Sequence, residues 1–278
     1  MIDTHTHLNF EVFEKDWKEV VKRAVNAGVS KMIVVGTDLY SSKKAVEMAE
    51  ENDSLFASVG IHPHHAKQFK ENDFLVLTEN QLRELEKLAQ NQNVVAIGEI
   101  GLDYHEYKNS NKYDDVSISE DLINVQKNIF DSQVRLAIQL NKPVIVHSRE
   151  AKDGVLVELL KHESTPLGVF HCFEGSKKFA KKIIDSGFYI SFTGNVTFDE
   201  GRSVVSKQVP LDKLLLETDS PFMLPNPLRD KKVNEGRFLR CEPENVKIIG
   251  QFHANLRGIS EDVVFAKTSD NAQRLFGI

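Results

Sequence analysis

Short, continuous apolar runs alternate along this chain with longer stretches in which apolar residues recur at helical spacing. The apolar runs are rich in Val and Ile, which is typical of strands buried on both faces of a parallel sheet. The runs cover residues 1–6, 31–36, 55–61, 94–100, 143–147, 167–172, 188–192 and 214–218.

The stretches between the runs predict helices. Gly28 is expected to end the first helix, and Ser260, followed by two acidic residues, is expected to begin the last. The predicted helices cover residues 12–27, 42–52, 79–92, 118–140, 151–162, 176–187, 244–256 and 260–276.

Eight strands, most of them followed by a helix, predict a single α/β domain over residues 1–278 with the closed (β/α)8 architecture of a TIM barrel. The alternative is an open, doubly wound sheet. Such a sheet would normally show a Gly-rich phosphate loop after an early strand, whereas the first run here ends in Thr-His-Thr-His.

Composition and charge narrow the class of protein. The 278 residues are 41% hydrophobic and 27% charged, and the net charge is −6, which argues against a protein that coats nucleic acid but not against an enzyme acting on a nucleic-acid end. The two cysteines imply no disulfide framework, and Cys172 is expected to point into the core. Without a basic leader or a membrane-length apolar run, we expect a cytoplasmic protein with no membrane contact and no obligate protein partner.

Histidines and carboxylates gather where the predicted strands end. Seven of the 10 histidines follow four of the runs, and acidic residues follow two others. In a TIM barrel the carboxyl ends of the strands form one face, where catalytic residues lie. The residues brought to that face are His5, His7, His62, His64, His65, Glu99, Asp103, His147, Arg149, Glu150, His171, Glu217 and Asp219.

This mixture of imidazole and carboxylate ligands suits Mg, Mn or Zn, with iron also compatible. His5, His7, Glu99 and Asp219 could hold one ion, and His147 and His171 with Glu99 a second, because the two oxygens of Glu99 can bridge a metal pair. Two divalent metal ions would activate a water for attack, and Asp219 could accept its proton.

Further residues are candidates for substrate contact or for positioning ligands. His62 and His64 flank Pro63 and could contact a phosphate or protonate a leaving group, and Arg149 brings positive charge. The segment 226–240 has five basic and two acidic residues and could contact a phosphate backbone. Asp3 is expected to share the inward face of its strand with His5 and to orient a ligand histidine.

Seven motifs in order resemble the TatD-type metal-dependent hydrolases, a branch of the amidohydrolase-like barrels. The motifs are IDTHTH (2–7), VGIHPH (59–64), AIGEIGLDY (96–104), PVIVHSREA (143–151), HCFEGS (171–176), LLLETDSPF (214–222) and NAQRLFG (271–277).

The resemblance implies a TIM barrel with a divalent metal pair and deoxyribonuclease activity. It places the six residues His5, His7, Glu99, His147, His171 and Asp219 at the metal ligands of the family, and His62 and His64 at its substrate-side histidines. The loops 104–117 and 221–240 are longer than is usual in the family, so they bear on substrate choice.

The sequence therefore predicts a metal-dependent phosphodiesterase, most simply a 3′–5′ exonuclease whose substrate is single-stranded DNA or DNA ends. Catalytic roles are expected for Asp219, Glu99 and His62, and substrate contacts for His62, His64 and Arg149. One alternative is a hydrolase of a small ester, cyclic amide or phosphoester that uses the same metal shell. The other is an interaction module with a vestigial site.

Overall fold

The computed structural model describes residues 1–67, 77–107, 117–230 and 239–278, and it contains all eight predicted strands. The strands are parallel and follow one another in the sheet in chain order, so each pairs with its sequence neighbours. Their bounds are β1 Ile2–Thr6, β2 Lys31–Val35, β3 Leu55–Val59, β4 Val94–Asp103, β5 Val144–Arg149, β6 Gly168–Phe170, β7 Tyr189–Phe192 and β8 Leu214–Leu216.

The sheet closes between β8 and β1 through the residues that follow β8. Thr6 and Ser220 form a parallel bridge, the Asp219 amide donates to the His5 carbonyl at 2.9 Å, and the His7 amide donates to the Ser220 carbonyl at 2.8 Å. This closure confirms the predicted (β/α)8 barrel. It also places the chain around His5 and His7 directly beside the chain around Asp219.

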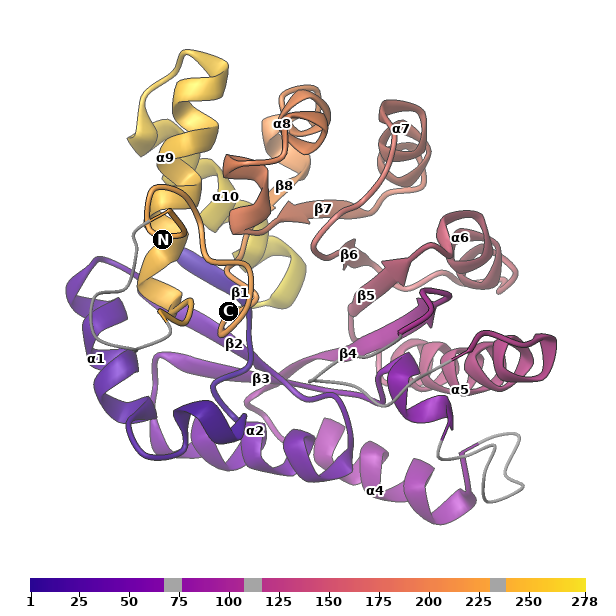
Figure 1. Ribbon diagram of the computed structural model, residues 1–278. Coiled ribbons are helices and arrows are strands. Elements are labelled where there is room, and N and C mark those ends of the chain that lie inside the picture. Colours follow the sequence, from indigo (N-terminus) through magenta and orange to yellow (C-terminus); the bar gives the residue numbers. More distant parts are fainter. Residues whose placement is uncertain (68–76, 108–116, 231–238) are drawn as a thin grey trace.

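Helices surround the strands (Figure 1). Most predicted helices are confirmed with small changes at their ends, but the first is shorter because residues 11–13 form a separate 3-10 turn. Helix α8 was not predicted, since it is only one or two turns long and contains Gly201. The helices are α1 Trp17–Asn26, α2 Leu39–Glu51, α4 Glu79–Ala89, α5 Glu120–Gln139, α6 Lys152–Leu160, α7 Lys177–Asp185, α8 Glu200–Ser206, α9 Val246–Arg257 and α10 Glu261–Phe276.

None of the helices in the described ranges is long and apolar enough to cross a membrane.

Apolar residues form two layers, one inside the barrel and one outside it. Ile33, Ile145, Val169 and Leu215 come from four different strands yet belong to one buried cluster, which only the barrel interior allows, and the end of α10 packs on that cluster. Their neighbours along the strands, such as Met32, pack against the helices instead. Paired residues on neighbouring strands point to the same side of the sheet. A residue whose partner belongs to the inner cluster therefore points into the barrel, and one whose partner belongs to the outer cluster points toward the helices.

The strands β1 and β4, which carry predicted metal ligands, each have one extra residue relative to a neighbouring strand. In β1, Asp3 and Thr6 pair with Met32 and Val34, so three steps along β1 match two along β2. In β4 the same irregularity falls between residues 97 and 100, around Glu99. Such bulges redirect side chains and occur next to active sites.

The bulge in β1 corrects the prediction for Asp3. Asp3 pairs with Met32, which packs against the helices, so Asp3 lies on the outer face of the strand. The extra residue between Asp3 and Thr6 reverses the alternation and leaves His5 and His7 on the inner face. Spacing of two along the chain therefore held for the two histidines but not for Asp3.

We predict that Gly101→Ala disrupts the barrel more than Gly187→Ala does. Both glycines have positive φ, at +152° and +94°. Nothing lies within 4 Å of a Cβ at Gly187, so that change costs only the backbone strain of about 1–2 kcal/mol. A Cβ at Gly101 would lie 1.9 Å from the carbonyl oxygen of His147, its partner in β5. Urea unfolding of the metal-free proteins measures the difference, and equal losses would contradict it.

Candidate metal centre

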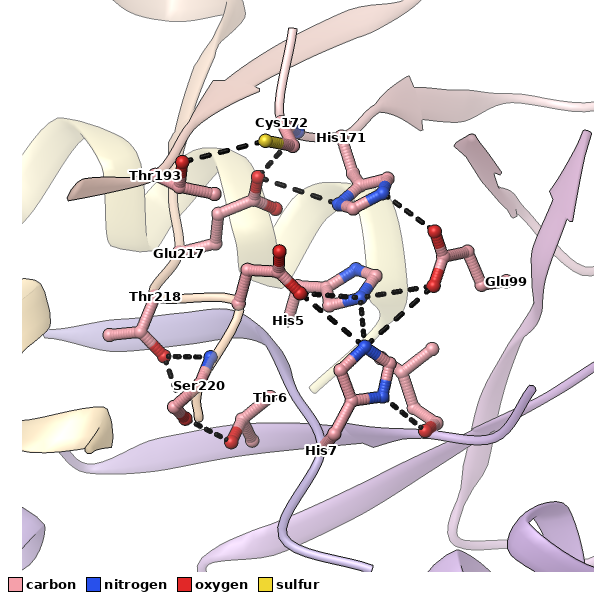
Figure 2. A network of polar contacts seen from close by, with 12 residues as sticks. His5, Thr6, His7, Glu99, His171, Cys172, Thr193, Glu217, Thr218 and Ser220 are labelled. Atoms are coloured by element: carbon pink, nitrogen blue, oxygen red, sulfur yellow. Dashed lines mark hydrogen bonds and ion pairs between the residues drawn. The ribbon is translucent and has the colours of Figure 1, made fainter. Parts of the chain in front are cut away.

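Four side chains from three segments converge at the carboxyl ends of β1, β4 and β8. His5 Nε2 and His7 Nε2 lie 3.2 Å apart, and each faces both Glu99 Oε2 and Asp219 Oδ1 at distances of 3.4–3.8 Å. Figure 2 shows the two imidazoles turned toward Glu99, which lies on β4. Donors bound to one ion at about 2.1 Å in a tetrahedral arrangement lie about 3.4 Å apart. The two imidazole nitrogens therefore have the spacing of ligands to one ion, both with each other and with either carboxylate.

The other oxygen of Glu99 faces a second set of imidazoles. Glu99 Oε1 lies 2.7 Å from His171 Nε2, 2.9 Å from His147 Nδ1 and 3.4 Å from His62 Nε2. Sets of donor atoms close enough to share one ion are His5 with Glu99 and His171, His5 with His7 and Asp219, and His62 with Glu99 and His147. The structure thus brings all six predicted ligands together, and it adds His62 to the His147 side.

The second ring nitrogen of three histidines fixes which nitrogen can bind a metal. His7 Nδ1 is 3.0 Å from the Val35 carbonyl, and His147 Nε2 is 3.1 Å from Asp103 Oδ2. Because the carbonyl or carboxylate holds a proton on one ring nitrogen, the other nitrogen, which faces Glu99, is the one that would present a lone pair to a bound cation. His171 has a similar but longer contact, since its Nδ1 lies 3.7 Å from Glu217 Oε1.

His62 has the opposite arrangement. Its Nδ1 accepts a hydrogen bond from the backbone amide of His64 at 3.1 Å, so in the neutral ring Nε2 carries the proton. Burial lowers the pKa of His62 well below its usual value, which keeps the ring neutral. His62 is therefore better suited to donate a hydrogen bond than to bind a metal.

Burial and charge act against each other at the centre of the site. Burial alone would raise the pKa of Glu99, but the surrounding imidazoles, His171 first, hold it well below its usual value. Burial likewise opposes protonation of His147, yet its hydrogen bonds to Asp103 and Glu99 raise its pKa to about 9. A bound cation would replace these protons, so metal binding is coupled to proton release.

Asp103 and Glu217 are functional residues to which the sequence analysis assigned no role. Asp103 Oδ2 lies 3.1 Å from both His147 Nε2 and His64 Nε2, and it accepts a hydrogen bond from the Tyr107 hydroxyl at 2.8 Å. Glu217 accepts the backbone amide of Cys172 at 2.6 Å beside His171 (Figure 2). Both residues follow predicted strands, which is the signal that could have identified them as orienting carboxylates.

A pocket of about 730 Å³ opens above the donor atoms. Arg149 lies in its wall, where its guanidinium donates to the Tyr107 hydroxyl at 2.9 Å and stands over the Tyr107 ring. The predicted substrate residues His62, His64 and Arg149 all line this pocket. Its lining is His7, Phe10, Thr37, His62, His64, His65, Lys67, Glu99, Tyr107, His147, Ser148, Arg149, His171, Cys172, Glu174, Asp219, Phe222 and Met223.

Two expectations about individual side chains are wrong. Cys172 lines the pocket rather than the core, because its φ of +42° turns the chain directly after His171. The second is that Arg240 is free to contact a phosphate: it forms ion pairs with Asp16 and Glu242, while the contact predicted for the rest of the basic segment 226–240 stays a prediction. Arg229 stands over the ring of Phe198, and residues 231–238 lie outside the described ranges.

Asp3 supports the site from the outer face of β1 and contacts no histidine ring. Its carboxyl group accepts the Thr218 amide at 2.9 Å and lies 2.6 Å from the Thr218 hydroxyl, which is itself 3.0 Å from the Ser220 hydroxyl. Burial raises the pKa of Asp3 to about 8. A protonated Asp3 can donate to Thr218, whose single proton is then free for Ser220.

A parallel barrel with buried histidines and carboxylates around a shared glutamate is the arrangement of a metal-dependent hydrolase. The sequence model described as TatD-related DNase matches residues 2–277, and the chain belongs to this family. The predicted family resemblance is thereby confirmed.

Individual relatives match over their full length. The metal-dependent hydrolase YabD of Bacillus subtilis (strain 168) is 37% identical, over 100% of this chain and 99% of that protein. The 3′-5′ ssDNA/RNA exonuclease TatD of Pantoea ananatis (strain LMG 20103) is 33% identical, over 100% of both. The crystal structure of the TatD homologue YJJV from Escherichia coli K12 has a TM-score of 0.83 and 29% identity, over 100% of this chain and 98% of that one.

We predict that divalent cations stabilise this protein through Glu99. A ligand present at 100 times its Kd raises the free energy of unfolding by about 2.7 kcal/mol, so Mn²⁺ or Zn²⁺ should raise the melting temperature of the wild type. Glu99→Gln should remove most of that increase, because Glu99 faces both donor sets. Glu174→Gln is the matched control, since Glu174 lines the same pocket but pairs with Arg202. Equal shifts in the two variants would exclude Glu99 as the shared ligand.

We also predict that Asp3→Asn gains stability relative to the wild type as pH rises. A folded-state pKa of about 8 exceeds the unfolded value of 3.8, so the contribution of Asp3 is fully present below pH 4 and is lost as pH rises through 8. Asparagine keeps the polar contacts and does not titrate. The difference should grow by at most about 1.4 kcal/mol per pH unit between pH 4 and 8.

Denaturant unfolding in the presence of a chelator measures this difference. Asp3→Ala, which removes the contacts at every pH, should be less stable than the wild type throughout. Parallel stability curves for the wild type and Asp3→Asn would show that Asp3 is already ionised in the fold.

Proposed function

We propose that this chain is a metal-dependent 3′–5′ exonuclease that hydrolyses single-stranded DNA from its end with a pair of divalent ions. The observation that carries the proposal is the environment of Glu99, whose two oxygens each face a different set of imidazole nitrogens. The name of the Pantoea relative, a 3′-5′ ssDNA/RNA exonuclease, supports the polarity and the single-stranded substrate.

Six side chains would hold the ions. Glu99 would be shared, with His5, His7 and Asp219 on the side of its Oε2 and with His147 and His171 on the side of its Oε1. When bound, the ions supply Lewis-acid activation of water and of the phosphoryl oxygens. Carboxylate oxygens and neutral imidazoles are a suitable donor set for Mn or Zn, and Mg is compatible with the carboxylates.

The remaining roles fall to residues in the pocket wall. Asp219 accepts the proton of the attacking water, which is the role expected of a carboxylate beside the donor set. His62 donates a hydrogen bond from Nε2–H to a phosphoryl oxygen, because its Nδ1 already accepts one. Arg149, held by Tyr107, offers its charge to the same or the next phosphate, while His64 stays paired with Asp103.

The pocket and the charge both favour a strand end over a continuous duplex. A volume of about 730 Å³ is that of a small-molecule site, which can take one or two nucleotides. The net charge of −6 supplies no general attraction for a long polyanion. We further propose that residues 1–278 form one catalytic domain, which works in the cytoplasm without an obligate protein partner.

We predict that the metal-loaded protein shortens a 5′-labelled single strand one nucleotide at a time. Asp219→Asn should lower kcat by about 10²- to 10⁴-fold, because it removes the proton acceptor. Asparagine tolerates the φ of +55° at this position, so the backbone is preserved. Arg149→Gln should raise KM more than it lowers kcat, since its role is to bind a phosphate.

Gel electrophoresis of the labelled strand measures both effects, and a 3′-blocked strand is the substrate control. Turnover of a small ester or cyclic amide without DNA cleavage would replace the nuclease by the alternative hydrolase. Unchanged function in Glu99→Gln and Asp219→Asn would instead favour an interaction module.

A further inference from the structure

One wall of the pocket is apolar although the rest is polar or charged. It is formed by Phe10, which follows β1, and by Phe222 and Met223, which follow β8. Arg149, at the end of β5, lines the pocket together with Lys67 and Glu174, which follow β3 and β6. Because β5 stands opposite β1 in an eight-stranded barrel, the apolar wall and Arg149 lie on opposite sides of the metal centre.

The apolar wall begins at a metal-ligand side chain. The Phe10 ring stacks on the His7 ring with centroids 4.4 Å apart and an interplanar angle of 12°. The Phe222 ring stands 6.2 Å from both His7 and Phe10, edge toward face. The wall therefore lies in direct contact with the His7 ring, whose Nε2 is one of the donor atoms. In a nucleotide, a single sugar joins the phosphate to the base, so a phosphate at the metals leaves its base within reach of this wall.

The segment that carries Phe222 and Met223 is fixed in place. The Phe222 amide donates to the Asp219 carbonyl at 2.9 Å, and the Asn226 amide donates to the Thr197 hydroxyl at 2.8 Å. A Cβ on Gly194 would lie 1.9 Å from the Met223 carbonyl, so only glycine allows this approach.

Met223 itself has a φ of +53° and is 37% exposed. A bulky residue in the left-handed region is strained, and such strain persists where the surrounding structure imposes it, commonly at functional sites. This backbone is therefore preformed, and it holds an apolar side chain at the mouth of a hydrolytic site.

We propose that Phe222 and Met223, backed by Phe10, form a stacking subsite for the nucleobase of the terminal nucleotide. This proposal rests on the proposed nuclease function and names how that site recognises its substrate. Aromatic side chains bind bases through their π faces, and a Met thioether packs well on aromatic rings. None of the three side chains offers a strong hydrogen-bond donor or acceptor, so the subsite accepts all four bases.

The test compares strands that end in a base with strands that end in an abasic nucleotide. For the wild type, removing the terminal base should raise KM by about 5- to 100-fold, the range of a stacked base. Phe222→Ala or Met223→Ala should raise KM for the base-bearing strand and leave KM for the abasic strand unchanged. Phe222→Tyr keeps the ring and should restore the wild-type value.

Leu167→Ala is the matched control for Met223→Ala. Leu167 is 60% exposed and directly precedes β6, at the end of the barrel away from the pocket. Its loss should change neither KM. If Phe222→Ala and Met223→Ala weaken both strands equally, or neither strand, the stacking subsite is wrong although the nuclease function stands.

Binding gives a second readout that does not require turnover. A short strand with a 3′-terminal 2-aminopurine should lose fluorescence on binding to the metal-loaded wild type, because stacking quenches that base, and Phe222→Ala should prevent the loss. If no strand is cleaved, the proposed function fails. If quenching is also absent, the subsite fails with it.

Discussion

The site depends on keeping one buried carboxylate ionised. Glu99 is 4% exposed, so its negative charge must be compensated locally. Imidazole nitrogens from β1, β5 and β6 surround both of its oxygens. Protons or metal ions can supply the compensating charge. A bound metal ion would therefore compete with protons for these side chains.

The hydrogen bonds behind the ligands determine how that charge is used. His7 is held by a backbone carbonyl and His147 by Asp103, so the other ring nitrogen of each is the one that would present a lone pair to a bound cation. His62 is held by a backbone amide and presents a proton. The three imidazoles are chemically identical. The partner of the ring nitrogen that faces away from the centre makes His7 and His147 suited to be ligands and His62 suited to donate a hydrogen bond.

The sequence predicts the barrel and its ligands because both depend on local pattern. Continuous Val- and Ile-rich runs mark buried parallel strands, and His and acidic residues directly after them must share one face. The sequence could not predict which face Asp3 occupies, since a one-residue bulge leaves no mark in the apolar pattern. The roles of Asp103 and Glu217 depend on which side chains meet across strands, as does the pocket position of Cys172.

Closure of the barrel links metal binding to substrate recognition. The hydrogen bonds between the backbones of His5 and Asp219, and of His7 and Ser220, join the two ligand-bearing segments. The same two segments continue within three residues into Phe10 and into Phe222, so the apolar wall is joined to the closure of the barrel. Arg240, paired with Asp16 and Glu242, fastens the later part of the β8 loop to the chain after β1. In the proposed complex, the position of the base relative to the metals would therefore depend on the hydrogen bonds that close the barrel.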